Sequence, residues 1–292
     1  DLTGNLGAAA SVAFFGPNAG GGAMAIKTIN GTAYEIHTFM AKDTTAPGGQ
    51  ETYALTFYRG DKSPANVEVL VVAGGGAGGY IYVPAYSPSG DPITVKVGAG
   101  GATVDDVHSR GGNGGDSEFD GDIKAHGGGG GAGHASGVAS GYSGANGGSG
   151  GGGTYAGGGG SGTVGTVPNG IIAFKLGNNG SKGGTSGAGG GGGGAGSAGS
   201  GGGWYEKSTL GGIGTTSAIS GAERWYAGGG AGGSRADFNS TDSLEAYGAV
   251  EGNAGEPGTG DGGSGGGGKF GKTISGGNGG NGIVIVRWPY IY

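Results

Sequence analysis

Short apolar segments alternate with long glycine runs along the chain, and the apolar segments predict β-strands. Residues 34–38 (YEIHT) and 53–58 (YALTFY) alternate well enough for half-buried strands, and the intervening 45–49 (TAPGG) is a turn signal. Residues 67–73 (VEVLVVA) and 283–288 (IVIVRW) are almost continuously apolar, which is typical of strands buried on both faces. We expect these two strands to pair and to enclose the glycine runs between them.

Weaker patterns predict further strands between the glycine runs. Residues 80–92 and 93–97 are expected to form a hairpin, because Pro, Ser and Gly punctuate the connection. Residues 118–124 (EFDGDIK) predict a short strand pair or turn, and 171–176 (IIAFKL) predicts a strand. A short helix is expected only at 242–249, where an Asp and a Glu have capping-box spacing.

Glycine dominates the composition, with 88 of 292 residues, and it argues against ordinary helix or sheet through the middle of the chain. Each glycine costs about 0.5–1 kcal/mol relative to alanine inside a helix or strand. The clearest run is 189–201 (GGGGGGAGSAGSG), and similar runs recur from Gly74 to Gly282. A flexible linker, a collagen-like helix and a packed glycine lattice are the three structures that such runs could form.

The distribution of the other residues favours the packed lattice. Collagen requires glycine at every third position with abundant proline, whereas this chain has 9 Pro and runs of up to six Gly. Glycine-rich linkers are flexible, but disordered chains lack the 34% hydrophobic residues and the 13 Tyr, 8 Phe and 3 Trp found here.

Charge and cysteine content narrow the partners and the compartment. The formal charge is −6 and the basic residues are scattered, so we expect no nucleic-acid partner. No segment is long and apolar enough for a membrane span, and no Cys is present for a disulfide. The chain begins at Asp1 rather than Met, which indicates a processed product, and we expect an extracellular location, secreted or on a cell surface.

A succession of motifs resembles a known family. The order is HTF at 37–39, VEVLVVAGGGAGG, ITVKVGAGG, GGNGGDSEF, repeated glycine blocks and NGGNGIVIVRW. Over roughly residues 33–288 this order is similar to the glycine-rich domain of phage tail fibre proteins and bacterial surface proteins. The resemblance implies that the glycine runs form bundled polyglycine II helices. We therefore expect a mostly irregular and β fold, in which such a bundle is bracketed by β-strands and almost no α-helix occurs.

Backbone chemistry is compatible with such a bundle. A polyproline II-type helix has three residues per turn, a rise of about 3.1 Å and no internal hydrogen bonds, so its backbone groups need partners on neighbouring helices. Glycine lets neighbouring polyglycine helices, which act as rods, approach closely, because no Cβ lies between them. A substitution at an inward glycine would force rods apart, and the interspersed Ala and Ser residues are therefore expected at outer positions.

The predicted organisation has four parts: an N-terminal extension or docking arm (1–30), a β-strand subregion (31–66), the glycine-rich domain closed by strands 67–73 and 283–288 (67–288), and an aromatic tail (289–292). The apolar patch at 8–15 is expected either as an edge strand of its own domain or as an arm that adds a strand to a neighbouring subunit.

Motifs that suggest catalysis lack their structural context. Residues 266–273 (GGGKFGKT) match the P-loop pattern, but neither a preceding strand nor a following helix is predicted. Three histidines, at 108, 126 and 134, lie near several aspartates, yet a glycine run separates the last two, so we expect no metal site. We predict a non-enzymatic protein without a cofactor.

Aromatic side chains are the candidate contact residues. Those in the connecting segments are candidates for binding a surface or for capping rod ends: Tyr82, Tyr86, Trp204, Tyr205, Trp225 and Tyr226. Residues near both termini are candidates for subunit contacts: Val12, Phe14, Phe15, Trp288, Tyr290 and Tyr292.

Two functions fit these features. The first is a structural subunit that polymerises with copies of itself into an extracellular fibre. The second is the tip adhesin of a phage tail fibre, on a virion tail, whose loops between glycine runs bind a host-surface protein or glycan. The apolar segments near both termini favour the first function, and the family resemblance favours the second.

Overall fold

The computed structural model describes most of the chain, and every regular element that it describes is a strand. The described residues are 19–42, 45–57, 64–75, 78–89, 91–104, 109–133, 143–155, 157–185, 188–202, 209–233, 255, 258–260, 268–269, 272–273 and 277–290. The expected helix at 242–249 and the apolar patch at 8–15 lie outside them.

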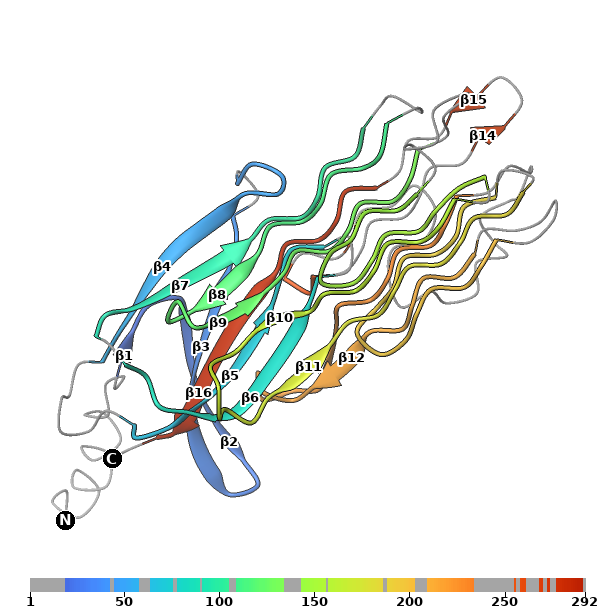
Figure 1. Ribbon diagram of the computed structural model, residues 1–292. Coiled ribbons are helices and arrows are strands. Elements are labelled where there is room, and N and C mark those ends of the chain that lie inside the picture. The colour runs from blue at the N-terminus through green and yellow to red at the C-terminus, as the bar shows by residue number, and fades with distance from the viewer. Residues whose placement is uncertain are drawn as a thin grey trace, which may run out of the picture.

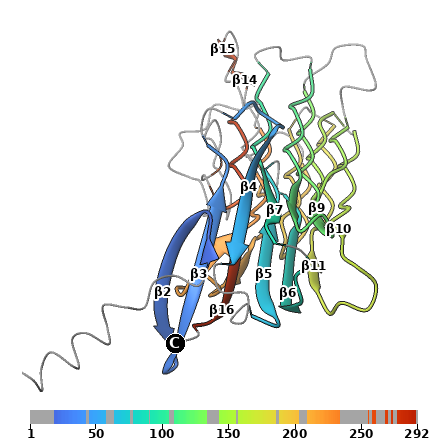
Figure 2. The ribbon, with the colours of Figure 1, turned by 90° about the vertical axis from the view of Figure 1, so that its left-hand side faces the viewer.

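Two open six-stranded sheets organise the fold (Figures 1 and 2). The first sheet has the order β1 (Ala19–Gly20), β4 (Gln50–Phe57), β7 (Ile93–Gly98), β8 (Ser117–Phe119), β9 (Ile123–Ala125) and β10 (Gly165–Thr166). The second has the order β11 (Phe174–Leu176), β6 (Tyr80–Tyr86), β5 (Val67–Val72), β16 (Ile283–Pro289), β3 (Thr32–Met40) and β2 (Ala23–Ile29). Two small antiparallel pairs join β12 (Thr215–Ser217) to β13 (Arg224–Tyr226) and β14 (Gly268–Lys269) to β15 (Lys272–Thr273).

The expected pairing of the two most apolar strands is confirmed. Strand β16 pairs antiparallel with β5, with Ile285 opposite Leu70, and on its other side it pairs antiparallel with β3. Side chains on both faces of β16 are buried, which explains why its sequence is continuously apolar rather than alternating. The strand that lies between β5 and β3 in the second sheet therefore begins more than 200 residues after β5 in sequence.

The expected hairpin between 80–92 and 93–97 is wrong. Strand β6 pairs with β5 and β11 in the second sheet, whereas β7 pairs with β4 and β8 in the first. The connection therefore crosses from one sheet to the other. The physical reason is that both strands bury apolar side chains in the space between the sheets, where Ile81, Val83, Ile93 and Val95 are fully buried.

The main core lies between the facing sheets. It combines residues of the first sheet, such as Leu55 and Phe119, with residues of the second, such as Phe39, Val69 and Trp288. A second core covers the opposite face of the second sheet. It contains residues from the sheet and from the glycine-rich part of the chain: Ile36, Leu70, Val72, Ile283 and Ile285 from the sheet, and Ala195, Ile219, Tyr226 and Ala227 from the glycine-rich part. The second sheet is consequently buried on both faces, whereas the first buries one.

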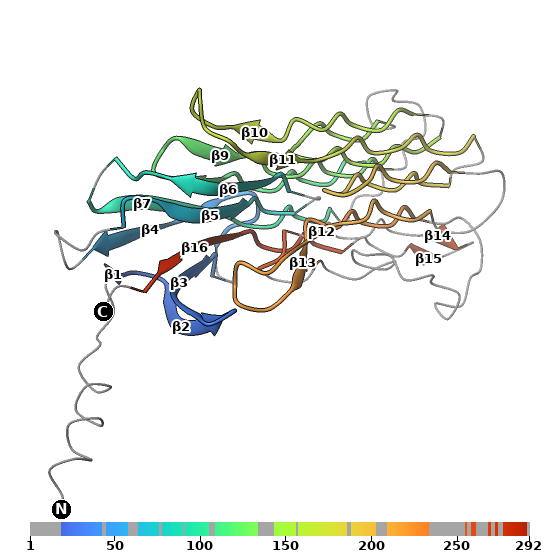
Figure 3. The same ribbon diagram turned by 90° about the horizontal axis from the view of Figure 1, so that it is seen from below.

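The strands continue into glycine segments that extend from one end of the two sheets (Figures 1 and 3). We call these segments together the glycine lattice: residues 73–75, 78–79, 99–104, 109–115, 126–133, 143–155, 157–164, 177–185, 188–202, 209–214, 227–233 and 277–282. They carry no helix or long strand, but they run side by side and are joined by backbone hydrogen bonds.

The N-terminal part of the described chain completes both sheets. Within the expected extension 1–30, residues 19–20 form β1 in the first sheet and 23–29 form β2 in the second. The expected subregion 31–66 supplies β3 to the second sheet and β4 to the first. Strand β2 was not predicted from the sequence, because its residues are a mixture of Ala, Met, Ile, Lys and Thr without a clear alternation of apolar and polar positions.

Candidate functional site

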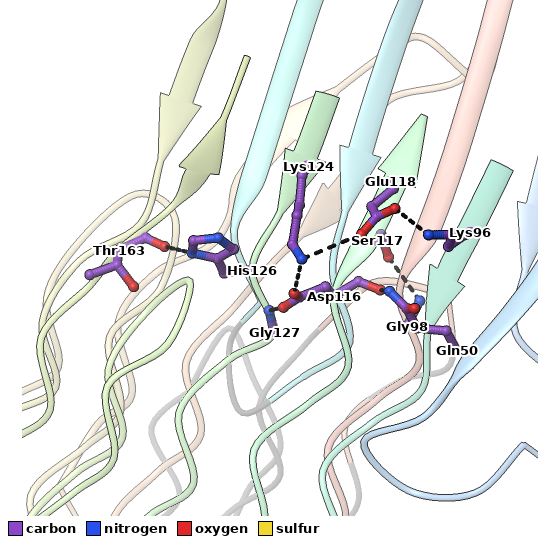
Figure 4. Close-up of polar contacts among 10 residues, drawn as sticks. All are labelled: Gln50, Lys96, Gly98, Asp116, Ser117, Glu118, Lys124, His126, Gly127 and Thr163. Atoms are coloured by element: carbon purple, nitrogen blue, oxygen red, sulfur yellow. Dashed lines mark hydrogen bonds and ion pairs between the residues drawn. The ribbon is translucent and has the colours of Figure 1, made fainter. Parts of the chain in front are cut away.

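Polar side chains mark the junction between the first sheet and the glycine lattice (Figure 4). The Asp116 carboxylate accepts a hydrogen bond from the Gly127 backbone N–H at 2.8 Å and lies 2.7 Å from the Lys124 ammonium. The Ser117 hydroxyl accepts a bond from the Gly98 N–H at 2.9 Å. These side chains therefore receive backbone donors at the points where strands end and glycine segments begin.

The charges at this junction are paired. Burial pushes the pKa of Glu118 upward, but hydrogen bonds to Lys96 and Lys124 hold it below its ordinary value, and the pKa of Asp116 is lowered in the same way by Lys124 and the Gly127 N–H. The stabilisation from a lowered carboxyl pKa is present above the ordinary value and disappears as the pH falls through the lowered one. The junction is therefore weakened by acid.

The segment 189–195 lies at the centre of the glycine lattice. Its successive N–H groups donate in rotation to three neighbouring stretches, so that every third residue donates to the same neighbour. These are 227–233, 150–153 and, beyond a bend at 195–197 of the same run, 197–200. The bonds are 2.8–3.0 Å long and join Gly189 to Gly233, Gly192 to Gly230, Ala195 to Ala227, Gly190 to Gly153, Gly193 to Gly150, Gly191 to Ser200 and Gly194 to Ser197.

The same segment also accepts hydrogen bonds from two further neighbours. The Ser181 N–H donates to the Gly191 carbonyl at 2.9 Å, and the Gly212 N–H donates to the Gly192 carbonyl at 2.8 Å. Five different segments thus surround 189–195, each bound through the backbone. Backbone groups buried in this way find partners on several surrounding stretches, whereas an α-helix satisfies them internally and a β-strand pairs only with the strands on its two sides.

Close approach explains why most positions in the segment must be glycine. A Cβ built on Gly191 would lie 2.0 Å from the Leu210 carbonyl oxygen, and one on Gly193 would lie 2.1 Å from the Asn178 carbonyl oxygen. A Cβ on Gly192, by contrast, meets no atom closer than 3.6 Å. The requirement is therefore specific to position and is set by the neighbouring backbone.

The expectation that Ala and Ser mark outer positions is only partly correct. Ser161 and Ala198 are exposed, as expected, but several small residues of the lattice are buried: Ala145, Ser149, Ala188, Ala195 and Ala231. The physical reason is visible at Ala195, whose methyl group packs in the second core among larger apolar side chains. A methyl group is accommodated wherever neighbouring segments leave room for it, inside the lattice as well as outside.

Asparagine side chains link the glycine segments, a role that the sequence reasoning missed. In five asparagines, Oδ1 accepts a hydrogen bond from a backbone N–H of another segment. The donors are the N–H groups of Gly130 to Asn113, Ser161 to Asn146, Gly162 to Asn179, Thr103 to Asn278 and Gly100 to Asn281, at 2.8–2.9 Å. The signal that could have found them is an Asn followed directly by Gly inside a glycine run.

Replacing Asn113 with alanine should destabilise the lattice, because the Gly130 N–H loses its acceptor at 2.9 Å. The expected loss in the free energy of unfolding is about 1 kcal/mol. The comparison variant is Asn113→Asp, which keeps an acceptor oxygen but loses the Nδ2 donor to the Asn146 carbonyl at 3.3 Å, as alanine also does, and it should lose less. Urea unfolding of the three proteins measures the difference, and equal losses in both variants would contradict the role of the oxygen.

Of the candidate surface-binding aromatics, two are buried and two reach the surface. Tyr86 and Tyr226 are 3% and 1% exposed, so they are core residues. The Tyr86 hydroxyl lies 2.9 Å from the Asp120 carboxylate, and burial together with this hydrogen bond raises the pKa of Tyr86. Tyr82 is half-buried and Trp225 is 47% exposed. Trp204 and Tyr205 lie outside the described residues.

The candidate subunit-contact residues that are described belong to the protein's own core. Trp288 is fully buried between the sheets, stacked on His37 with ring centroids 5.3 Å apart. Tyr290 is 7% exposed, and its N–H donates to the Ala33 carbonyl at 2.8 Å. Trp288 is buried because β16 lies between β5 and β3 in a sheet whose two faces are both covered. The remaining candidates lie outside the described residues: Val12, Phe14, Phe15 and Tyr292.

A cross-strand row of side chains runs over the second sheet and ends at its edge. The Arg287 guanidinium lies 4.9 Å from the Tyr34 ring centroid and binds both oxygens of Glu68 at 2.8 and 3.0 Å. The Tyr82 hydroxyl donates to Glu68 at 2.6 Å, and its ring stacks on Phe174 at 6.1 Å. Phe174 is 57% exposed, so the row ends in an ordered aromatic pair at β11.

The structure describes parts of the stretches that resemble catalytic or metal-binding motifs. In the P-loop-like stretch, Lys269 pairs with Lys272 and Gly268 with Thr273 in the β14–β15 pair, so Lys272 and Thr273 do not begin a helix there. His126 contacts the Thr163 carbonyl through Nδ1 at 2.8 Å. The described ranges contain no group of three or more His, Asp or Glu side chains arranged to hold a metal, and His108 and His134 lie outside them.

Comparison with known proteins finds a family for the glycine-rich part of the chain. The family model described as a glycine-rich domain matches residues 59–289. The chain belongs to this glycine-rich domain family. No curated protein and no solved structure matches it. The glycine-rich domain match includes the whole lattice and the closing strand β16, but it begins after β4.

Strands outside the matched range complete the sheets of the glycine-rich domain. Strand β3 pairs with β16, and β4 pairs with β7, although neither β3 nor β4 lies within 59–289. The structural unit therefore extends upstream of the family match to at least Ala19. Where the structure describes the chain, no helix is long and apolar enough to cross a bilayer.

Proposed function

We propose that the glycine segments form a bundle of polyglycine II helices and that the protein is a non-enzymatic subunit of an extracellular fibre. The observation that carries the first part is the three-residue rotation of hydrogen-bond donors in 189–195. A helix with three residues per turn points every third N–H in one direction, so each neighbour receives donors at a spacing of three. Neither a strand, with a period of two, nor an α-helix produces this pattern.

The lattice supports a structural role because it is built from the backbone. Its cohesion comes from hydrogen bonds between segments and from side-chain links such as Asn281, whose Oδ1 accepts from Gly100 and whose Nδ2 donates to the Ala41 carbonyl. Hydrogen bonds of this kind contribute about 0.5–1.5 kcal/mol each. Such a hydrogen-bonded body, extending from one end of the two sheets, suits a mechanical element, and copies of the chain are its proposed partners.

Self-assembly is the direct test of the fibre proposal. Purified protein examined by negative-stain electron microscopy under native conditions is expected to form filaments with a regular repeat. Discrete monomers or trimers at every concentration that the protein tolerates would contradict the proposal. Sedimentation analysis of the same samples measures the assembled fraction independently of adsorption to the grid.

A second candidate function, the tip adhesin of a phage tail fibre, is favoured by the aromatic edge at β11. Ile172 and Phe174 are 75% and 57% exposed, and the Glu68–Tyr82 hydrogen bond fixes the ring that stacks on Phe174. Exposed, ordered aromatic rings suit binding to a host glycan or protein surface. If this function is correct, the Phe174→Ala variant should lose binding to host cells while keeping its thermal stability.

A further inference from the structure

The four edges of the two six-stranded sheets differ in how they are protected. Three edge strands are very short: β1 and β10 have two residues each and β11 has three. Strand β2 has seven residues, and no described strand pairs with its outer side (Figure 2). Natural proteins avoid association through sheet edges by shortening the edge strand or by adding proline, bulges or charge. Of the four edge strands, only β2 is not shortened.

The other protective devices are also weak at β2. Its sequence, AMAIKTI, contains no proline, and its pairing with β3 runs from Ala23 to Ile29 without a register shift. Its one charged side chain, Lys27, donates from Nζ to the Ser220 carbonyl of the same chain at 2.9 Å. The ammonium is therefore engaged within the protein. A long, regular and nearly uncharged edge of this kind is a template for an added strand.

Apolar side chains on β2 are incompletely covered. Met24 and Ile26 lie opposite His37 and Glu35, which are fully buried between the sheets, yet they are 42% and 43% exposed themselves. They are on the inner side of the second sheet, next to its edge. The first sheet faces this side, but its edge strand β1 has only two residues and leaves Met24 and Ile26 partly exposed. An added strand at β2 would cover both side chains.

We infer that the outer edge of β2 accepts residues 8–15 of a second copy of the chain as an added strand. This inference rests on the proposed fibre and names its joint. The segment 8–15 (AAASVAFF) lies outside the described residues, is uncharged and would span about 26 Å if extended, comparable with the seven residues of β2. Main-chain hydrogen bonds would supply affinity and the alternate side chains of the segment would supply specificity.

The geometry of the joint fits an open polymer. The donor segment is tethered three residues before β1, at the edge of the first sheet, whereas the acceptor β2 is the edge of the second sheet. Donor and acceptor are different surfaces, so the contact is heterologous, and repeating it generates a filament when the rotation does not close into a ring. A contact between two β2 strands would use one surface twice and would give a closed dimer.

Disulfide trapping tests the joint directly, because the chain contains no Cys. Two single-cysteine proteins of different size, Val12→Cys and Ile26→Cys, are mixed under assembly conditions and oxidised. We expect a disulfide-linked heterodimer. The matched control replaces the acceptor with Ile213→Cys, which lies in the lattice with 41% exposure against 43% for Ile26, and should not cross-link to Val12→Cys.

The outcomes separate this inference from the proposed fibre. Filaments without a Val12–Ile26 cross-link would overturn the joint and leave the fibre standing. A third protein carries both Val12→Cys and Ile26→Cys. A cross-link within one chain of this double variant, at dilutions where no assembly occurs, would show that residues 8–15 pair with β2 of their own chain. An Ile26→Cys homodimer without the Val12 cross-link would indicate paired β2 edges instead. Absence of filaments from the wild-type protein would contradict the fibre itself.

A charged substitution on the edge strand β2 provides a second test of the inferred joint. The Ile26→Lys variant should raise the protein concentration needed for assembly by at least about tenfold, because an edge lysine opposes strand addition. Ile213→Lys adds the same charge at a similar exposure and should leave that concentration unchanged. Both variants should keep the wild-type melting temperature, since both side chains are exposed. Equal assembly by the two variants would overturn the assignment of β2.

Discussion

Replacing Gly193 with alanine is expected to destabilise the protein, whereas the same change at the adjacent Gly192 should stabilise it slightly. The new Cβ at position 193 would lie 2.1 Å from the Asn178 carbonyl oxygen and 2.7 Å from both the Asn178 carbonyl carbon and the Asn179 carbonyl oxygen. These are backbone atoms held by hydrogen bonds, so they cannot move aside as a side chain would. Overpacking of this kind costs about 1–3 kcal/mol, and occasionally more.

Gly192→Ala is the matched control, because it lies in the same segment and differs by one residue. Its Cβ would meet no atom closer than 3.6 Å, and its N–H would continue to donate to the Gly230 carbonyl. Alanine narrows the unfolded ensemble, which stabilises a protein by about 0.4–1 kcal/mol where the native backbone accepts it. Chemical unfolding measures both changes. Losses of equal size at the two positions would contradict the close packing around 189–195.

Replacing His37 with leucine should lower the free energy of unfolding by about 2–6 kcal/mol, since it removes a hydrogen-bond partner from two buried polar groups. His37 is fully buried, its Nδ1–H donates to the Gly21 carbonyl at 2.6 Å, and its Nε2 lies 2.9 Å from the Glu35 carboxyl oxygen. Loss of the imidazole removes its contacts with the Glu35 carboxyl and the Gly21 carbonyl, both of which lie in the protein interior. Thermal and urea unfolding measure the loss.

Two further variants identify the cause. The double variant Glu35→Leu/His37→Leu should recover part of the lost stability, because both members of the hydrogen-bonded pair are then replaced by apolar side chains. His126→Leu is the control for removing a histidine as such: its Nδ1 also contacts a carbonyl oxygen, that of Thr163 at 2.8 Å, but at an exposed position, so the expected loss is about 1 kcal/mol. A double variant no more stable than His37→Leu would show that the loss comes from packing alone.

Strand prediction succeeded where burial constrains the sequence. Residues of β5 and β16 are buried on both faces, and only continuously apolar strands can occupy such positions, so the sequence identified both strands and their pairing. Strand β2 was missed for the opposite reason. Most of its side chains are exposed, and an exposed edge strand needs no particular pattern. The placement of β6 and β7 in different sheets also escaped the local pattern, because a turn signal does not specify which sheet the chain enters next.

The aromatic candidates show the same division. Tyr82 and Tyr86 are four residues apart in one strand and carry the same side chain, yet Tyr82 stacks on Phe174 at an edge and Tyr86 contacts Phe119 in the core. The sequence predicted that aromatic residues would lie between glycine runs. Which of them reach the surface depends on the strands that pack against them, and those strands come from distant parts of the chain.

The sequence by itself determined that this chain is glycine-rich, that its apolar segments are strands and that two of them enclose the glycine runs. Only the tertiary structure decided which glycines are indispensable, because the runs are nearly identical and their partners lie far away. The Gly75 N–H, for example, donates to the Gly280 carbonyl more than 200 residues later. Glycine has no side chain to encode its neighbour, so the position of each segment follows from the strands that hold its ends and from the few asparagines that link it to the next.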